Sequence, residues 1–129
     1  MSASTNPAPA TSSDLARLKA SATVLLGLIL IQVVFAIVVL VNDDATMKAI
    51  HGGFGYLSLI TALVATWFAW RWTKTSAAKG VFFHTLSLPI LCVVQIGLAD
   101  AGLTWVHVVL GVVYLAAVAG LWAMLRRRA

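Results

Sequence analysis

The sequence predicts an all-α integral membrane protein, an up-down-up-down bundle of four helices built from two pseudo-repeated hairpins. Of its 129 residues, 61% are hydrophobic and only 10% are charged, whereas soluble domains are about half apolar and about a quarter charged. The apolar residues gather in four runs, each as long as the roughly 20 residues that a helix needs to cross a bilayer. The connections between the runs are short, which favours antiparallel neighbouring helices.

The four spans follow a polar N-terminal segment. Residues 1–19 begin with a stretch rich in Ser, Thr, Ala and Pro, so we expect a disordered cytoplasmic tail there. Residues 20–129 are expected to form one four-helix domain. In the third span, Pro89 removes the backbone hydrogen bond to the Thr85 carbonyl, which predicts a kink. The spans are expected at residues 20–41, 47–72, 80–99 and 103–125.

The charges predict how the chain crosses the membrane. Eight of the 9 Lys and Arg residues lie before the first span, between Arg71 at the end of the second span and the start of the third, or after the fourth. Because basic segments stay on the cytoplasmic side, we expect a multi-pass protein of the cytoplasmic (inner) membrane with both termini in the cytoplasm. Topology and anionic lipid account for the basic charge, so no nucleic-acid partner is expected. The single cysteine, Cys92, excludes an intramolecular disulfide framework.

Two histidines in the spans occupy matching positions. His51 and His107 each lie about one turn into a span that starts on the outer side, so both are expected roughly 6 Å below the outer ends of their helices. Each has a glycine four positions later, Gly55 or Gly111, on the same helix face and one turn deeper. A flat macrocycle ligated by the imidazoles needs that space. The pattern therefore predicts a bis-histidine haem site, with both histidines as metal ligands.

Glutamines extend this repeat into the preceding spans. Gln32 precedes His51 by 19 positions, and Gln95 precedes His107 by 12. We expect Gln95 to hold the second ring nitrogen of His107, as partners of metal ligands do, whereas Gln32 is expected to lie deeper than His51. Tyr114 is expected to hydrogen-bond a haem propionate or to serve as a core aromatic residue.

These motifs carry a family resemblance. The stretch from Val94-Gln95-Ile96-Gly97 through a short turn to His107-x-x-x-Gly111 resembles one four-helix half of haem A synthase, and the hairpin of Gln32 and His51 resembles its preceding half-repeat. Uncharacterised small four-helix membrane proteins share the H-x-x-x-G pattern. The resemblance covers about residues 25–125 and implies that His51 and His107 are the axial pair.

The chain departs from that family at two places. The family's substrate-binding half has a glutamate one turn before its first histidine, where this chain has Met47, and many bacterial members have a cysteine pair in an outer loop, which this chain lacks. Methionine cannot act as a base. The resemblance therefore supports a haem b bundle better than it supports haem A synthesis, and it leaves open whether the chain is an enzyme.

Two function classes remain open at the level of the sequence. The first is a haem protein that transfers electrons or handles haem, with the lipid bilayer, another membrane subunit or a quinone, or a second copy of the chain as partners. The second is a haem-free accessory or scaffold protein of unknown partner, in which the polar residues only lock helix packing. His84 shares its depth with no other histidine, so an interfacial role beside Lys79 is expected for it.

Overall fold

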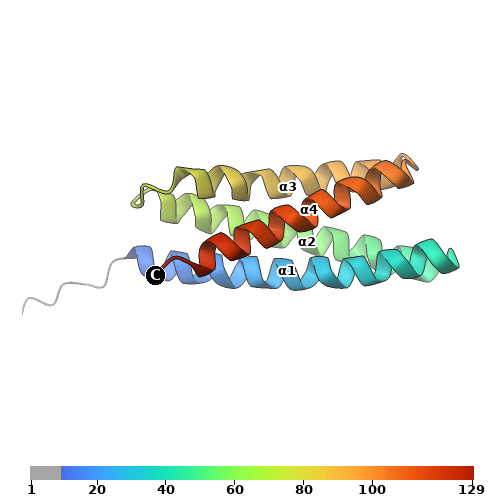
Figure 1. Cartoon of the computed structure of the whole chain (residues 1–129), viewed down its shortest axis with the longest axis horizontal. Helices are drawn as coiled ribbons and strands as arrows, with labels where there is room; N and C mark the ends of the chain where they lie inside the picture. Colours follow the sequence, from blue (N-terminus) through green and yellow to red (C-terminus); the bar gives the residue numbers. More distant parts are fainter. Residues whose placement is uncertain (1–9) are drawn as a thin grey trace, which may run out of the picture.

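The computed structural model describes residues 10–129 and confirms the helical bundle (Figure 1). All regular structure in this range is helical. Each helix is long and apolar enough to cross a membrane, which identifies the chain as a multi-pass membrane protein. The helices are α1 (Ala10–Asn42), α2 (Ala45–Thr73), α3 (Lys79–Asp100) and α4 (Thr104–Arg126).

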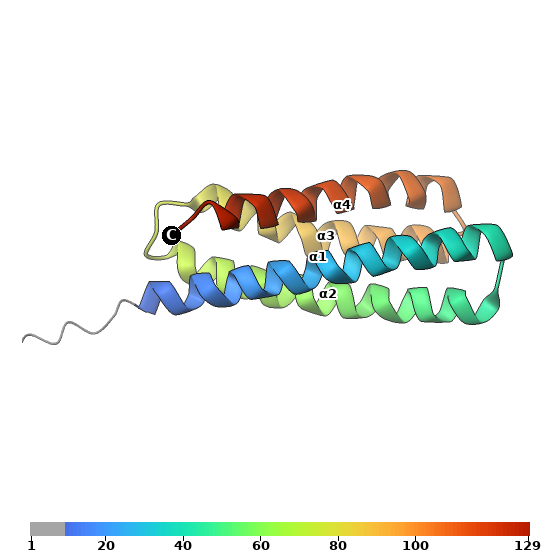
Figure 2. The same cartoon turned by 60° about the horizontal axis from the view of Figure 1, so that its bottom comes forward.

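The helices run alternately up and down and form a ring in which each contacts its two neighbours in the chain, with α4 closing against α1. Consequently α2 and α4, the two helices that carry the matched histidines, are diagonal partners. Figures 1 and 2 show the C-terminus and the α2–α3 connection at one end, and the two tighter turns at the other. We call the first the basic end and the second, where His51 and His107 lie, the histidine end.

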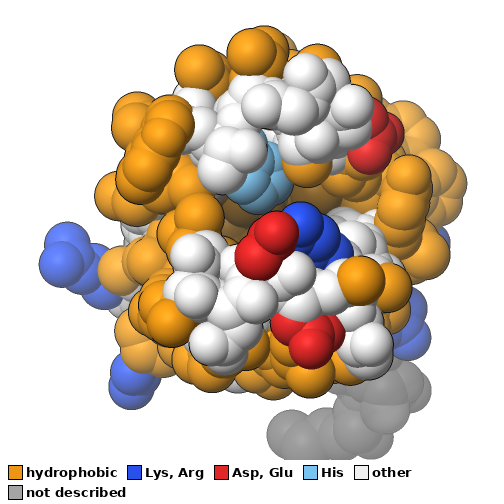
Figure 3. Space-filling view, turned by 90° about the vertical axis from the view of Figure 1, so that its right-hand side faces the viewer, with side chains coloured by type: hydrophobic (Ala, Val, Ile, Leu, Met, Phe, Trp, Pro, Cys, Tyr) orange, Lys and Arg blue, Asp and Glu red, His pale blue; other side chains and the backbone are white. Residues whose placement is uncertain are grey.

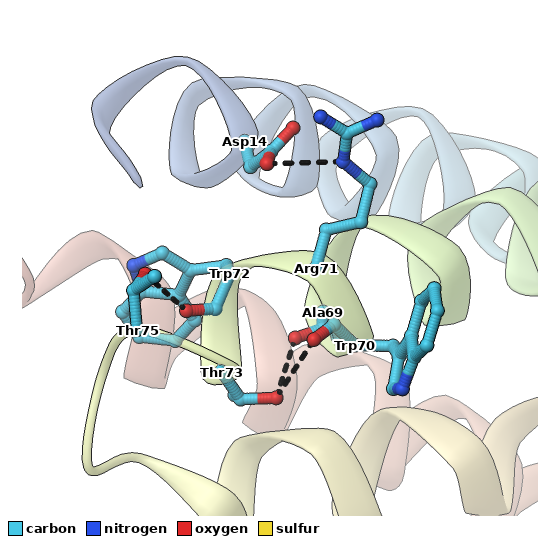
Figure 4. A network of polar contacts seen from close by, with 7 residues as sticks. All are labelled: Asp14, Ala69, Trp70, Arg71, Trp72, Thr73 and Thr75. Atoms are coloured by element: carbon cyan, nitrogen blue, oxygen red, sulfur yellow. Dashed lines mark hydrogen bonds and ion pairs between the residues drawn. The ribbon is translucent and has the colours of Figure 1, made fainter. Parts of the chain in front are cut away.

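The start of α1 corrects the expected tail. The helix begins at Ala10, so residues 10–19 are helical, while residues 1–9 lie outside the described residues. Leu15 and Leu18 are buried in the core. Asp14 is also buried, and one of its carboxylate oxygens accepts a hydrogen bond from Arg71 Nε of α2 at 3.1 Å (Figure 4). These contacts hold the first turns of α1 against α2.

Pro89 lies within α3 and leaves the Thr85 carbonyl without its normal backbone donor. The single hydroxyl proton of Thr66 on α2 is shared between the Ala62 carbonyl of its own helix, at 2.8 Å, and the Thr85 carbonyl, at 3.3 Å. A backbone carbonyl in a membrane interior has no water to bind. Helix α3 therefore accommodates Pro89 because the Thr66 hydroxyl of α2 partly satisfies the Thr85 carbonyl.

The two turns at the histidine end are built differently. Asp43 follows α1 with a positive φ of 47°, and Asp44 caps α2 by accepting a hydrogen bond from the Met47 backbone at 2.8 Å. The α3–α4 turn uses Gly102, whose φ of 72° favours glycine. Both turns reverse the chain within a few residues, which brings each glutamine-bearing helix directly beside a histidine-bearing one.

The hydrophobic core fills only the basic half of the bundle. On every helix the buried core residues run from the basic end to about the middle, and none lies nearer the histidine end. The last buried positions are Ile29, Ser58, Cys92 and Tyr114, one on each helix. The other half of the bundle is therefore held together without a close-packed centre.

Candidate functional site

A cavity of about 320 Å³ takes the place of the core in the histidine half. All four helices line it, and the four residues at which the core ends form its floor. Figure 3 looks onto the histidine end and shows a hollow with a histidine side chain inside it and acidic side chains around it. Pockets of a few hundred Å³ with mostly apolar walls and a few polar groups are typical of small-molecule and cofactor sites.

His51 and His107 face each other across this cavity. Their ring centroids are 6.0 Å apart, and the ring planes meet at 76°. Both side chains are half-buried and line the cavity from opposite helices of the ring. Because α2 and α4 are diagonal partners, the two imidazoles meet from opposite walls of the cavity.

His107 is oriented by the main chain of Gln95. Its Nδ1 lies 2.9 Å from the Gln95 carbonyl oxygen, so Nδ1 carries the proton and donates. Gln95 therefore holds the second ring nitrogen of His107, as expected, and does so through its main-chain carbonyl. The hydrogen bond fixes the tautomer in which Nε2 has a free lone pair, the form in which histidine binds metals.

His51 has a related but looser environment. Its Nδ1 is buried and has no hydrogen bond of normal geometry among the described residues, although the ring lies close enough to the Gln32 backbone to interact with it electrostatically. The two histidines therefore differ in how firmly the protein orients them.

Gly55 and Gly111 line the cavity one turn below the histidines, as expected, and each receives a glutamine side chain. A Cβ at Gly55 would lie 3.5 Å from Gln32 Nε2, and a Cβ at Gly111 would lie only 2.9 Å from Gln95 Nε2. The glycines thus make room for the two glutamine amides at the cavity wall. The sequence marked Gln32 as polar and deep, but it gave no sign of this pairing across helices.

The floor of the cavity carries polar groups on one side. Tyr114 is buried there, and its hydroxyl lies beside the Cys92 thiol without a hydrogen bond of ordinary geometry among the described residues. Cys92 donates to the Gly55 carbonyl at 3.7 Å. Tyr114 therefore lies well away from the mouth of the cavity, and Cys92 lines the cavity although the sequence indicated no role for it there.

The mouth of the cavity carries charge. Asp100 belongs to its lining, and Asp43 pairs with Lys48 at the nearby α1–α2 turn. The hydrogen bond from Lys48 lowers the pKa of the fully exposed Asp43 carboxyl below its usual value. This turn therefore keeps its ion pair to a lower pH than a free aspartate would allow.

His84 lies outside the cavity. Its Nε2 donates to the Ala117 carbonyl of α4 at 2.8 Å, so it links α3 to α4. This helix–helix hydrogen bond is a role that the sequence did not indicate, while the interfacial position beside Lys79 stays a prediction.

The two hairpins supply the cavity with matched sets of residues. Every lining residue of α3 lies 63 positions after a lining residue of α1, and every lining residue of α2 lies 56 positions before one of α4. The matched pairs include Gln32 with Gln95, His51 with His107, and Gly55 with Gly111. The two shifts differ by seven residues, about two helical turns, which keeps the same helix faces toward the cavity. The site therefore has an approximate two-fold symmetry about the bundle axis.

Comparison of the chain with protein-family models, with curated proteins and with solved structures finds no match.

Proposed function

We propose that the chain is a membrane haem protein that holds haem b between His51 and His107. The observation that carries this proposal is the 6.0 Å separation of the two ring centroids across a cavity. Two imidazoles bonded at about 2 Å to opposite sides of one metal ion have ring centres roughly 6 Å apart. Because His107 Nδ1 donates to the Gln95 carbonyl, its Nε2 keeps a free lone pair with which to bind the metal ion.

The small number of protein ligands supports a macrocycle rather than a bare ion. Among residues 10–129, no group of three or more His, Cys, Asp or Glu side chains could hold a metal together. A structural zinc ion needs four ligands. Two histidines on opposite walls suffice only when the bound group brings the remaining ligands itself, as a porphyrin does.

The proposed pair of imidazole ligands supports a role in electron transfer or haem handling. Haem held by two imidazoles supplies one-electron chemistry and keeps no open coordination position for a substrate. His51 and His107 would be the ligands, the Gln95 main chain would fix the His107 ring, and Gly55 and Gly111 would keep the cavity wall open. The partner is then a membrane quinone or another membrane subunit, reached from the histidine end.

The charge pattern supports an orientation for this site. All Lys and Arg residues except Lys48 lie at the basic end, which the positive-inside rule assigns to the cytoplasm of a cytoplasmic membrane. The haem site would then lie in the outer half of the bilayer.

Replacement of single histidines tests the proposal. In detergent-purified protein from haem-replete cells, His51→Ala and His107→Ala should each abolish the low-spin haem spectrum, because each removes one axial ligand. His84→Ala is the matched control, since that side chain bonds Ala117 outside the cavity. Loss of colour in the His84 variant alone, or a colourless wild type, would refute the assignment and favour a haem-free scaffold.

A further inference from the structure

Two glutamine side chains line the cavity from α1 and α3, the diagonal pair of helices that carries no cavity histidine. Gln32 of α1 and Gln95 of α3 are the two glutamines of the chain, and they occupy equivalent positions in its two hairpins. Each amide crosses to the glycine of the neighbouring helix, Gly55 or Gly111. The four walls of the cavity therefore present an imidazole pair on one diagonal and an amide pair on the other.

The amides pack against the glycines but their hydrogen bonds are incomplete. The side-chain carbonyl oxygens of Gln32 and Gln95 are both buried and have no hydrogen-bond partner among the described residues. A buried polar group without a partner destabilises the folded protein, and lipid offers no partner in place of water. Two such groups at equivalent positions of the same cavity need a common explanation.

Packing does not require an amide at these positions. Methionine has nearly the same length and flexibility and carries no group that must be hydrogen-bonded, so it would fill the notch beside each glycine without the cost of an unpaired carbonyl. Gln95 also orients His107 through its main chain, which any residue could do. Neither the packing of the bundle nor the orientation of His107 therefore requires the side-chain amide of Gln32 or Gln95.

We infer that the amides of Gln32 and Gln95 are ligand-contacting groups whose hydrogen bonds are completed when haem fills the cavity. The inference rests on the proposed function. An amide offers both an N–H donor and a carbonyl acceptor, and rotation of the terminal group exchanges them. Its partner is an oxygen atom, carried by a haem carboxylate or by a water molecule held between the haem and the wall.

Methionine substitution tests the inference with two measurements. Gln32→Met and Gln95→Met should raise the melting temperature of the haem-free protein, because each removes an unpaired buried carbonyl. Each should also weaken haem binding in a spectroscopic titration by roughly five- to tenfold, the equivalent of one lost hydrogen bond. Val34→Met and Val94→Met are the matched controls, since these neighbouring side chains are exposed to the outside of the bundle.

The titration also identifies the oxygen. If wild type prefers haem to its dimethyl ester and the Met variants lose that preference, the amides contact a carboxylate; equal weakening with both ligands identifies bound water. Met variants that bind haem as tightly as wild type would overturn the inference while leaving the histidine assignment intact. A wild-type protein that binds no haem would instead overturn the proposed function itself.

Discussion

Each cavity histidine works beside a glutamine of the preceding helix, and the two pairs are unequal. The Gln95 main chain holds His107 at 2.9 Å, whereas His51 Nδ1 has no partner of normal geometry. The pairing of His51 with His107 could be predicted from their equal depth and the shared glycine spacing. The role of the Gln95 carbonyl could not, because every residue carries a backbone carbonyl and only the packing of α3 on α4 selects this one.

The glycine contacts predict an unequal response to alanine. In Gly111→Ala the new Cβ would lie 2.9 Å from Gln95 Nε2, so the Gln95 amide must move away from residue 111. In Gly55→Ala the Cβ would lie 3.5 Å from Gln32 Nε2, an ordinary contact. Because the end of a glutamine moves easily and alanine favours helix by about 1 kcal/mol, both variants should fold.

Haem titration of the two glycine variants measures the consequence. Gly111→Ala should bind haem roughly tenfold more weakly than Gly55→Ala, a difference of about 1.4 kcal/mol, because only Gly111→Ala displaces an amide. Circular dichroism in detergent serves as the folding control. Equal affinities in two folded variants would show that the position of Gln95 is irrelevant to the ligand.

At the level of the helices, Thr66 of α2 contacts the Thr85 carbonyl of α3 that Pro89 leaves without a backbone donor. The sequence predicts that Pro89 frees the Thr85 carbonyl, and the structure shows that Thr66 Oγ1 approaches it at 3.3 Å. Thr66→Val should therefore lower the unfolding free energy by about 1 kcal/mol, within the range for hydrogen bonds between membrane helices. Thermal unfolding in detergent micelles measures the loss.

A double-mutant cycle separates this contact from packing. Pro89→Ala restores the backbone N–H that can bond Thr85, so Thr66→Val should cost less in the Pro89→Ala background than in wild type. An identical cost in both backgrounds would mean that the Thr66 hydroxyl does not replace the missing donor.

The four spans could be predicted from the apolar runs, but the start of α1 could not. Asp14, Arg17 and Lys19 make the first turns look like a soluble tail. The helix extends there because Leu15 and Leu18 enter the core and Asp14 pairs with Arg71, 57 positions away. Contacts between residues so far apart in the sequence leave no periodic or compositional sign.

The whole molecule divides into a packed half and a hollow half. The core ends at Ile29, Ser58, Cys92 and Tyr114, and the cavity begins at the same level. The sequence indicated two similar hairpins, and their seven-residue offset explains why the motifs matched imperfectly along the chain while the helix faces still meet. The extent of the cavity could not be predicted, because apolar runs look alike whether they enclose a core or a void.

The packed half accounts for how the bundle can hold together around a cavity. Buried residues from all four helices meet at the basic end, so the hollow half needs no core of its own. Stability is thus concentrated away from the histidines, and the site can be shaped for its ligand.

The absorption spectrum of the purified wild-type protein, together with its haem content per chain, is the strongest single test of haem binding between His51 and His107. We expect one haem per chain, a sharp Soret band and a low-spin spectrum when reduced, because two imidazoles complete the coordination of iron. A colourless protein after haem-replete expression, or a high-spin spectrum that signals a single axial ligand, would contradict it.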